Sequence, residues 1–119
     1  MNPQLLIVDD DEDIRSQMRW ALAQDYEILQ AEDRPSAIET FRQHRPMVVL
    51  LDLGLPPSAG TPEEGLATLS TIVKQEPMAK VVILSGQSEK DNALRAIGMG
   101  AYDFLCKPAE VEELKIILK

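Results

Sequence analysis

The sequence predicts an α/β fold in which five parallel strands form an open sheet with helices on both faces. Short apolar runs alternate along the 119-residue chain with segments whose apolar residues recur at helical spacing. Two of these runs, residues 47–51 and 81–84, are apolar throughout, as in strands that are buried on both faces. Because crossover connections are right-handed, we expect a doubly wound sheet, and we place the first strand in its interior, in the order 2-1-3-4-5.

Length and composition limit the possible functions. The chain suits one compact domain, since 45% of its residues are hydrophobic. Its formal net charge of -8 argues against direct binding of nucleic acid. The apolar runs are far shorter than the roughly 20 residues that span a bilayer, and no leader precedes them, so we expect a cytoplasmic protein without a membrane partner. The single Cys106 excludes an internal disulfide and should be buried, and the single His44 offers no zinc cluster.

The first strand, at residues 4–8, ends abruptly in five acidic residues, 9–13. Asp11 or Asp13 is expected to cap the following helix, because acids in the first turn suit the helix dipole. Trp20 lies away from the inward face of that helix and should be partly exposed. The inward face comprises Ile14, Met18, Ala21 and Leu22.

The second strand, at residues 26–30, is more polar and should lie near an edge of the sheet. The helix after it has Pro35 in its first turn, a position that tolerates proline. The central strand at 47–51 ends in Asp52, and Gly54 and two prolines then stop any further regular structure. The inward face of the second helix comprises Ala37, Ile38 and Phe41.

The second half repeats this pattern. The fourth strand, at 81–84, ends in Ser85, a weaker helix covers residues 89–97, and a last strand at 102–106 ends in Lys107. The final helix reaches the end of the chain without a stop signal, so we expect it to be cut and the chain to be the front part of a longer protein. The inward faces of the last three helices are Leu66, Leu69, Ile72 and Val73; Ala93, Ala96 and Ile97; and Val111, Leu114, Ile117 and Leu118.

The polar residues at the strand ends should form one site. The predicted strand order places Asp9 and Asp10 beside Asp52, with Ser85 and Lys107 on the other side of it. Converging carboxylates repel one another, and a divalent cation removes that penalty; Mg²⁺ suits a site with one or two carboxylates and phosphate oxygens. A carboxylate can also attack phosphorus and form an aspartyl phosphate when the phosphoryl charge is neutralised.

Four motifs in this order resemble the receiver domain of bacterial two-component response regulators. The resemblance covers essentially the whole chain and implies the flavodoxin-like (βα)5 fold. The motifs are Leu-Ile-Val-Asp9-Asp10, Val-Leu-Leu-Asp52-Leu-Gly-Leu-Pro56, Ile-Leu-Ser85-Gly86 and Gly-Ala-Tyr-Asp-Phe104-Leu-Cys-Lys107-Pro108.

The resemblance implies a role for each site residue. Asp52 would be the phosphoacceptor. Asp10, Asp52 and the carbonyl of Gly54 would bind Mg²⁺ directly, and Asp9 would act mainly through a metal-bound water.

The same resemblance implies that Lys107 contacts the phosphoryl group, that Ser85 donates a hydrogen bond to it, and that Phe104 turns inward as Ser85 moves. It also implies a cis peptide before Pro108 and an influence of Gly54 and Gln87 on the lifetime of the phosphate. The expected partners are a sensor histidine kinase, an attached output domain for transcription regulation, and a second copy bound through the face of helix 4, strand 5 and helix 5.

One loop departs from the family pattern. Gly65 lies thirteen positions after Asp52, where receivers have an equivalent glycine about eight positions on, which indicates an insertion of about five residues. The loop at 57–64 is either a tolerated surface insertion or a source of Glu63 or Glu64 near the cation. It resembles loops in receivers of sigma-54-type enhancer-binding regulators, including those of PEP-CTERM systems.

Other functions remain open on the sequence. A haloacid-dehalogenase-type phosphatase also uses a strand-end Asp nucleophile, but it needs a second Asp where this chain has Gly54. A flavin-binding module needs a phosphate loop rich in Ser, Thr or Gly after the first strand, which this chain lacks. A receiver that signals without phosphate is disfavoured because all five site positions are filled. We therefore expect a phosphorylation switch and not an enzyme.

Overall fold

The computed structural model describes residues 2–57, 60–86, 89–107 and 110–118. Its five strands form one parallel sheet in the order β2-β1-β3-β4-β5, so the predicted fold and strand order are confirmed. The strands are β1 (Gln4–Val8), β2 (Glu27–Ala31), β3 (Val48–Asp52), β4 (Lys80–Ser85) and β5 (Asp103–Cys106). The helices are α1 (Glu12–Leu22), α2 (Arg34–His44), α3 (Glu63–Gln75), α4 (Lys90–Gly98) and α5 (Val111–Leu118).

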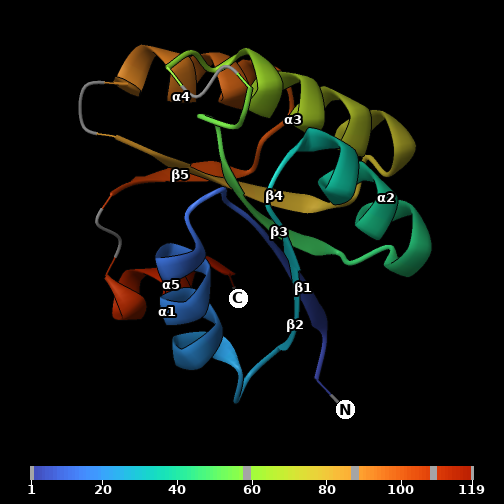
Figure 1. Ribbon diagram of the computed structural model, residues 1–119, viewed down its shortest axis with the longest axis vertical. Helices are drawn as coiled ribbons and strands as arrows, with labels where there is room; N and C mark the ends of the chain where they lie inside the picture. Colours follow the sequence, from blue (N-terminus) through green and yellow to red (C-terminus); the bar gives the residue numbers. More distant parts are fainter. Residues whose placement is uncertain (1, 58–59, 87–88, 108–109, 119) are drawn as a thin grey trace.

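The helices cover the sheet in two layers, with α2, α3 and α4 over one face and α1 and α5 over the other (Figure 1). Alternate residues of the central strands enter the two cores: Leu6 and Val49 pack under α2 and α3, whereas Ile7 and Leu50 pack under α1 and α5. All four side chains are fully buried. The sheet is therefore closed to solvent on both faces, and polar residues of its central strands reach water only at the strand ends.

Local signals define the helix ends near the site. Of the two predicted caps of α1, Asp11 and Asp13, the structure has Asp11, whose side chain accepts hydrogen bonds from the N–H groups of Asp13 and Ile14. Asp33 and Ser36 form a reciprocal capping box at the start of α2. These caps fix where the chain leaves β1 and β2, and hence the loops at the C-terminal edge of the sheet.

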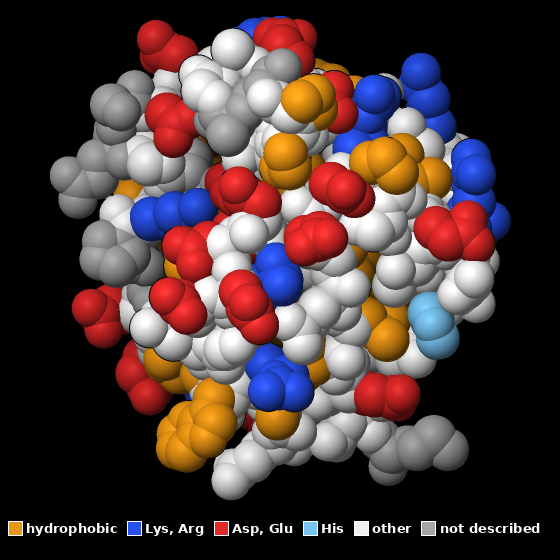
Figure 2. Space-filling model, viewed as in Figure 1, with side chains coloured by type: hydrophobic (Ala, Val, Ile, Leu, Met, Phe, Trp, Pro, Cys, Tyr) orange, Lys and Arg blue, Asp and Glu red, His pale blue; other side chains and the backbone are white. Residues whose placement is uncertain are grey.

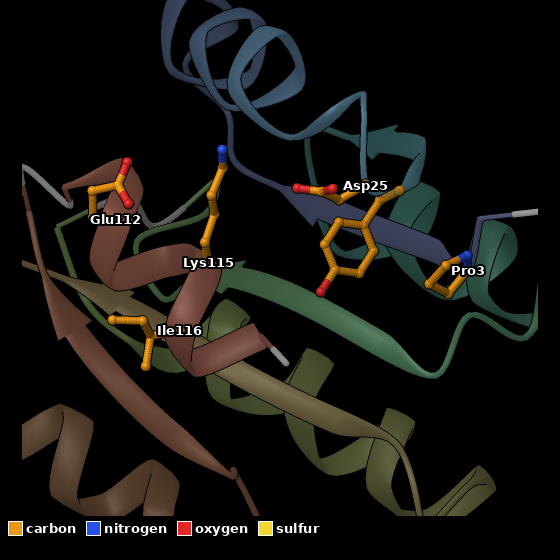
Figure 3. Close-up of a pocket in the computed structure, with 6 residues that line it drawn as sticks. Pro3, Asp25, Glu112, Lys115 and Ile116 are labelled. Carbon is orange, nitrogen blue, oxygen red and sulfur yellow. The ribbon is translucent and has the colours of Figure 1, made fainter.

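The end of α5 is held by a buried hydrogen bond. The hydroxyl of Tyr26, just before β2, donates to the Leu118 carbonyl over 3.0 Å. Beside it lies a cavity of about 420 Å³ (Figure 3). Its lining residues are Pro3, Asp25, Tyr26, Glu112, Lys115 and Ile116. Because Pro3 precedes β1, this cavity lies at the edge of the sheet opposite the predicted site.

Three predictions of burial were wrong. Met47 is 47% exposed because β3 begins only at Val48. Cys106 is exposed because it is the last residue of β5, which is an edge strand of the sheet. Val111 is 37% exposed at the first turn of α5, whose buried contacts come from Leu114 and Leu118. Trp20, predicted to be partly exposed, is 88% exposed. Among the described residues, none of the helices combines the length and apolar character that crossing a membrane requires.

Candidate phosphoacceptor site

Three carboxylates meet at the C-terminal ends of β1 and β3. Val8 pairs with Leu51, so the residues that follow them, Asp9 and Asp52, are neighbours. Carboxylate oxygens of Asp9, Asp10 and Asp52 lie within 4.8 Å of one another. Asp9 is 1% exposed and Asp52 8% exposed, whereas Asp10 is exposed to solvent. The cluster thus contains two buried carboxylates, Asp9 and Asp52, and one exposed carboxylate, Asp10.

Lys107 bridges the two less accessible acids from the end of β5. Its Nζ lies 3.4 Å from Asp9 Oδ2 and 3.2 Å from Asp52 Oδ2. Burial disfavours the ammonium, but the attraction of Asp52 and Asp9 outweighs it and raises the Lys107 pKa above its ordinary value. Lys107 is therefore held as a cation against the acid cluster.

Asp9 carries the electrostatic cost of this arrangement. Burial raises the pKa of Asp9 from 3.8 to about 6; the hydrogen bond from the Asp11 N–H opposes that rise, and the charge of Asp52 adds to it. Lys107 also lowers the Asp9 pKa, but not enough to offset burial. Because burial disfavours the ionised form of Asp9, any further cation at the site would stabilise that carboxylate.

The residues present fit a divalent metal ion. Apart from its ion pair with Lys107, the buried Asp9 Oδ2 has no hydrogen-bond partner among the described residues, and the cluster consists of the hard oxygen donors that Mg²⁺ prefers. The Gly54 N–H donates to Asp52 Oδ1 over 3.2 Å, which fixes the orientation of that carboxylate. The structure therefore places Gly54 against Asp52, and the role of its carbonyl as a ligand stays a prediction.

Ser85 and Phe104 complete the predicted set. Ser85 is 2% exposed, and within the described part of the chain its Oγ has no hydrogen-bond partner. The Lys107 N–H donates to the Ser85 carbonyl over 2.7 Å and ties the ends of β4 and β5 together. Phe104 is half-buried and packs on the core under α2, α3 and α4. Its switching role stays a prediction, and Gln87 and Pro108 lie outside the described residues.

The comparison with known families decides the identity of this arrangement. The model of the response regulator receiver domain matches residues 5–119. The chain belongs to this family.

The relatives of this receiver domain include transcription regulators. It is 35% identical over 97% of its length to a putative NtrX-like response regulator of Rickettsia bellii, and 29% identical over 97% to the regulatory protein AtoC of Escherichia coli. It spans 24% of each of those proteins, about a quarter of their length. Among solved structures, the receiver domain of NtrX from Brucella abortus superimposes with a TM-score of 0.88 at 36% identity, covering 96% of this chain and 93% of that one.

One contact of the receiver domain that supports the acid cluster was not predicted. Arg15 Nη1 donates to the Asp9 carbonyl over 2.7 Å, and Arg15 Nε donates to Gln30 Oε1 over 3.3 Å. Arg15 thereby fixes the turn that carries Asp9 and Asp10. Its position one helical turn after a cap residue was the available signal, but the sequence does not show that its side chain folds back.

The two described ends of the connection between β3 and α3 are in direct contact. The Gly65 N–H donates to the Leu53 carbonyl over 3.2 Å, and a Cβ on Gly65 would lie 2.3 Å from Leu53 Cα. Only glycine fits there, and its equivalence to the family glycine stays a prediction. Glu64 pairs with Arg34 at 3.0 Å, which favours a surface insertion over a further metal ligand.

Proposed function

We propose that this receiver domain takes a phosphoryl group from the phosphohistidine of a sensor histidine kinase onto Asp52. The observation that carries the proposal is the position of Lys107 Nζ, in contact with both Asp52 and Asp9 beside an acid cluster suited to Mg²⁺. A cation is thus already in place where negative charge accumulates during phosphoryl transfer.

The chain supplies the nucleophile and neutralises the transferred group. An Asp52 oxygen attacks phosphorus and forms the new O–P bond while the P–N bond to the kinase histidine breaks, and its electron pair remains on the imidazole nitrogen. Lys107 neutralises one phosphoryl oxygen, and the buried Ser85 hydroxyl gains an acceptor in the phosphoryl group. Gly54 stands where a dehalogenase-type phosphatase has its general acid, which supports a phosphoacceptor and not an enzyme that turns over.

Mg²⁺ would be held by Asp10, Asp52 and the Gly54 carbonyl, with Asp9 acting through a bound water. When bound, the ion supplies further positive charge to the phosphoryl oxygens. Asp9 Oδ2 is buried and has only Lys107 beside it as an ion-pair partner, so a further cation at the cluster would stabilise the Asp9 carboxylate.

The output lies outside this chain in our proposal. The acyl phosphate would bias a two-state equilibrium that an attached domain reads, most plainly a sigma-54-type transcription regulator as in the relatives. A second copy would bind through α4, β5 and α5, where Leu94, Tyr102 and Ile116 are 52%, 60% and 76% exposed. Acidic side chains are spread over the face shown in Figure 2, with Lys and Arg among them, which supports a domain that does not itself bind nucleic acid.

Intact-mass spectrometry tests the proposal. Incubation with acetyl phosphate and Mg²⁺ should add about 80 Da, one phosphoryl group, to the unmutated protein. Asp52→Asn should abolish the gain, and Asp33→Asn, which changes a capping carboxylate in α2, should retain it. No gain in the unmutated protein would contradict the proposal, and catalytic turnover of small phosphate esters would contradict its non-enzymatic part.

A further inference from the structure

The first residue after β4 makes a contact that the proposed phosphoryl transfer does not use. The Gly86 N–H donates to Glu89 Oε1 over 3.0 Å, and the Glu89 N–H donates to the Gly86 carbonyl over the same distance. The Glu89 side chain thus caps the Gly86 amide across the turn that leads into α4, and a backbone hydrogen bond closes the same turn. A Cβ on Gly86 would lie 2.8 Å from Glu89 Oε1, so the carboxylate lies directly against that glycine.

Strand geometry directs the Gly86 amide toward the acid cluster. The Ser85 carbonyl accepts from Lys107 on the β5 side, and successive backbone groups of a strand alternate between its two neighbours. Lys80, which has the same parity as Gly86, donates its N–H to the β3 side over 2.7 Å. The amide that follows Ser85 is therefore directed to the β3 side, where Asp52 ends its strand.

Two hydrogen-bond donors beside Asp52, the Ser85 hydroxyl and the Gly86 N–H, thus differ in whether they already have an acceptor. The Ser85 hydroxyl is buried and unpartnered within the described residues, whereas the Gly86 N–H already binds an anion, the carboxylate of Glu89. A phosphoryl group on Asp52 brings new anionic oxygens to this position. Both donors are suited to them, but only one is free.

We propose that Glu89 is an internal competitor for the phosphoryl group, which holds the Gly86 amide until the acyl phosphate on Asp52 displaces it. This inference rests on the proposed function. Displacement would release Glu89, the residue immediately before α4, from the Gly86 amide, so the same exchange that binds the phosphoryl group loosens the start of the helix whose Leu94 is exposed on the α4–β5–α5 face. Because Glu89 must first be displaced from the Gly86 amide, it lowers the affinity of the site for the phosphoryl group.

The test is the affinity of the full chain for beryllofluoride, a phosphoryl analogue, in the presence of Mg²⁺, followed by the amide resonances in NMR spectra. Glu89→Ala should bind beryllofluoride about fivefold more tightly than the unmutated protein, because a charge-assisted hydrogen bond no longer competes. Glu89→Gln keeps an acceptor and the shape of the cap, so it should fold normally and fall between the two. Asp91→Ala removes the same charge from the first turn of α4 and should leave the affinity unchanged.

The Gly86 amide gives a second readout. Its resonance should differ between the unmutated protein and Glu89→Ala when both are free, and the two should coincide when both are saturated with beryllofluoride. Equal affinities of Glu89→Ala, Glu89→Gln and Asp91→Ala would overturn the competition while leaving phosphorylation at Asp52 intact. Absence of any adduct that depends on Asp52 would instead overturn the proposed function, and the inference with it.

Discussion

Replacing Asp9 by asparagine should stabilise the protein in the absence of metal at neutral pH. Asp9 is 1% exposed, and burial raises its pKa from 3.8 to about 6 even though the Asp11 N–H and Lys107 favour the ionised form. That rise corresponds to about 3 kcal/mol of free energy. Asn keeps an acceptor for the Asp11 N–H but loses the attraction to Lys107, so we expect a gain of about 1–3 kcal/mol in the free energy of unfolding.

The gain should depend on pH with a definite sign. Because the folded pKa of Asp9 lies above the unfolded one, the folded protein binds more protons between pH 4 and pH 6. The contribution of Asp9 to stability therefore falls as the pH rises through that window and stays low above it. The advantage of Asp9→Asn should be full at pH 7.5 and about half as large at pH 5.

Urea unfolding followed by far-UV circular dichroism in EDTA measures this effect. Fluorescence is a poor probe because Trp20 is already 88% exposed in the folded protein. Asp10→Asn alters an exposed carboxylate in the same loop and should change stability by less than about 0.5 kcal/mol. An Asp9→Asn protein that is no more stable at pH 7.5, or whose advantage does not shrink at pH 5, would refute the reasoning.

The remaining predictions concern packing. Gly65→Ala should destabilise the protein by about 3 kcal/mol, because the new methyl group meets Leu53 backbone atoms that cannot yield; Gly60→Ala, with nothing within 4 Å of its Cβ, is the matched control. Equal urea midpoints for the two variants would show that α3 can shift freely. Tyr26→Phe should cost about 1 kcal/mol by removing the buried hydrogen bond to Leu118, and an unchanged melting temperature would mean that this bond adds nothing to the docking of α5.

The sequence predicted the parts of the site that follow from strand pattern alone. A strand buried on both faces reveals its end by the first polar residue, and parallel strands have their C-terminal ends at one edge, so Asp9 and Asp52 had to be near each other once β1 and β3 were neighbours. Lys107 followed from the same rule. The helix caps were equally local, and Asp11 was found because capping depends on a few adjacent residues.

The sequence could not predict the contacts of long side chains that fold back onto the loop before their helix. The contact of Arg15 with the Asp9 carbonyl and that of Glu89 with Gly86 each join a helix to the loop before it, through torsions that no periodic pattern encodes. Burial at element ends was equally difficult. Met47 and Cys106 are apolar and adjoin strands, yet they lie where the covering layers stop.

Because Leu53 and Gly65 are in direct contact, the length of the loop between them does not determine the geometry of the site. The backbone hydrogen bond and the close packing between Leu53 and Gly65 fix the position of the first turn of α3 relative to the sheet, whatever path the chain takes between these two residues. The part-buried ion pair of Glu64 with Arg34 joins the first turn of α3 to the start of α2. The length of the connection between β3 and α3 can therefore vary without moving the start of α3, and the carboxylates of Asp9 and Asp52 keep the places that β1 and β3 give them.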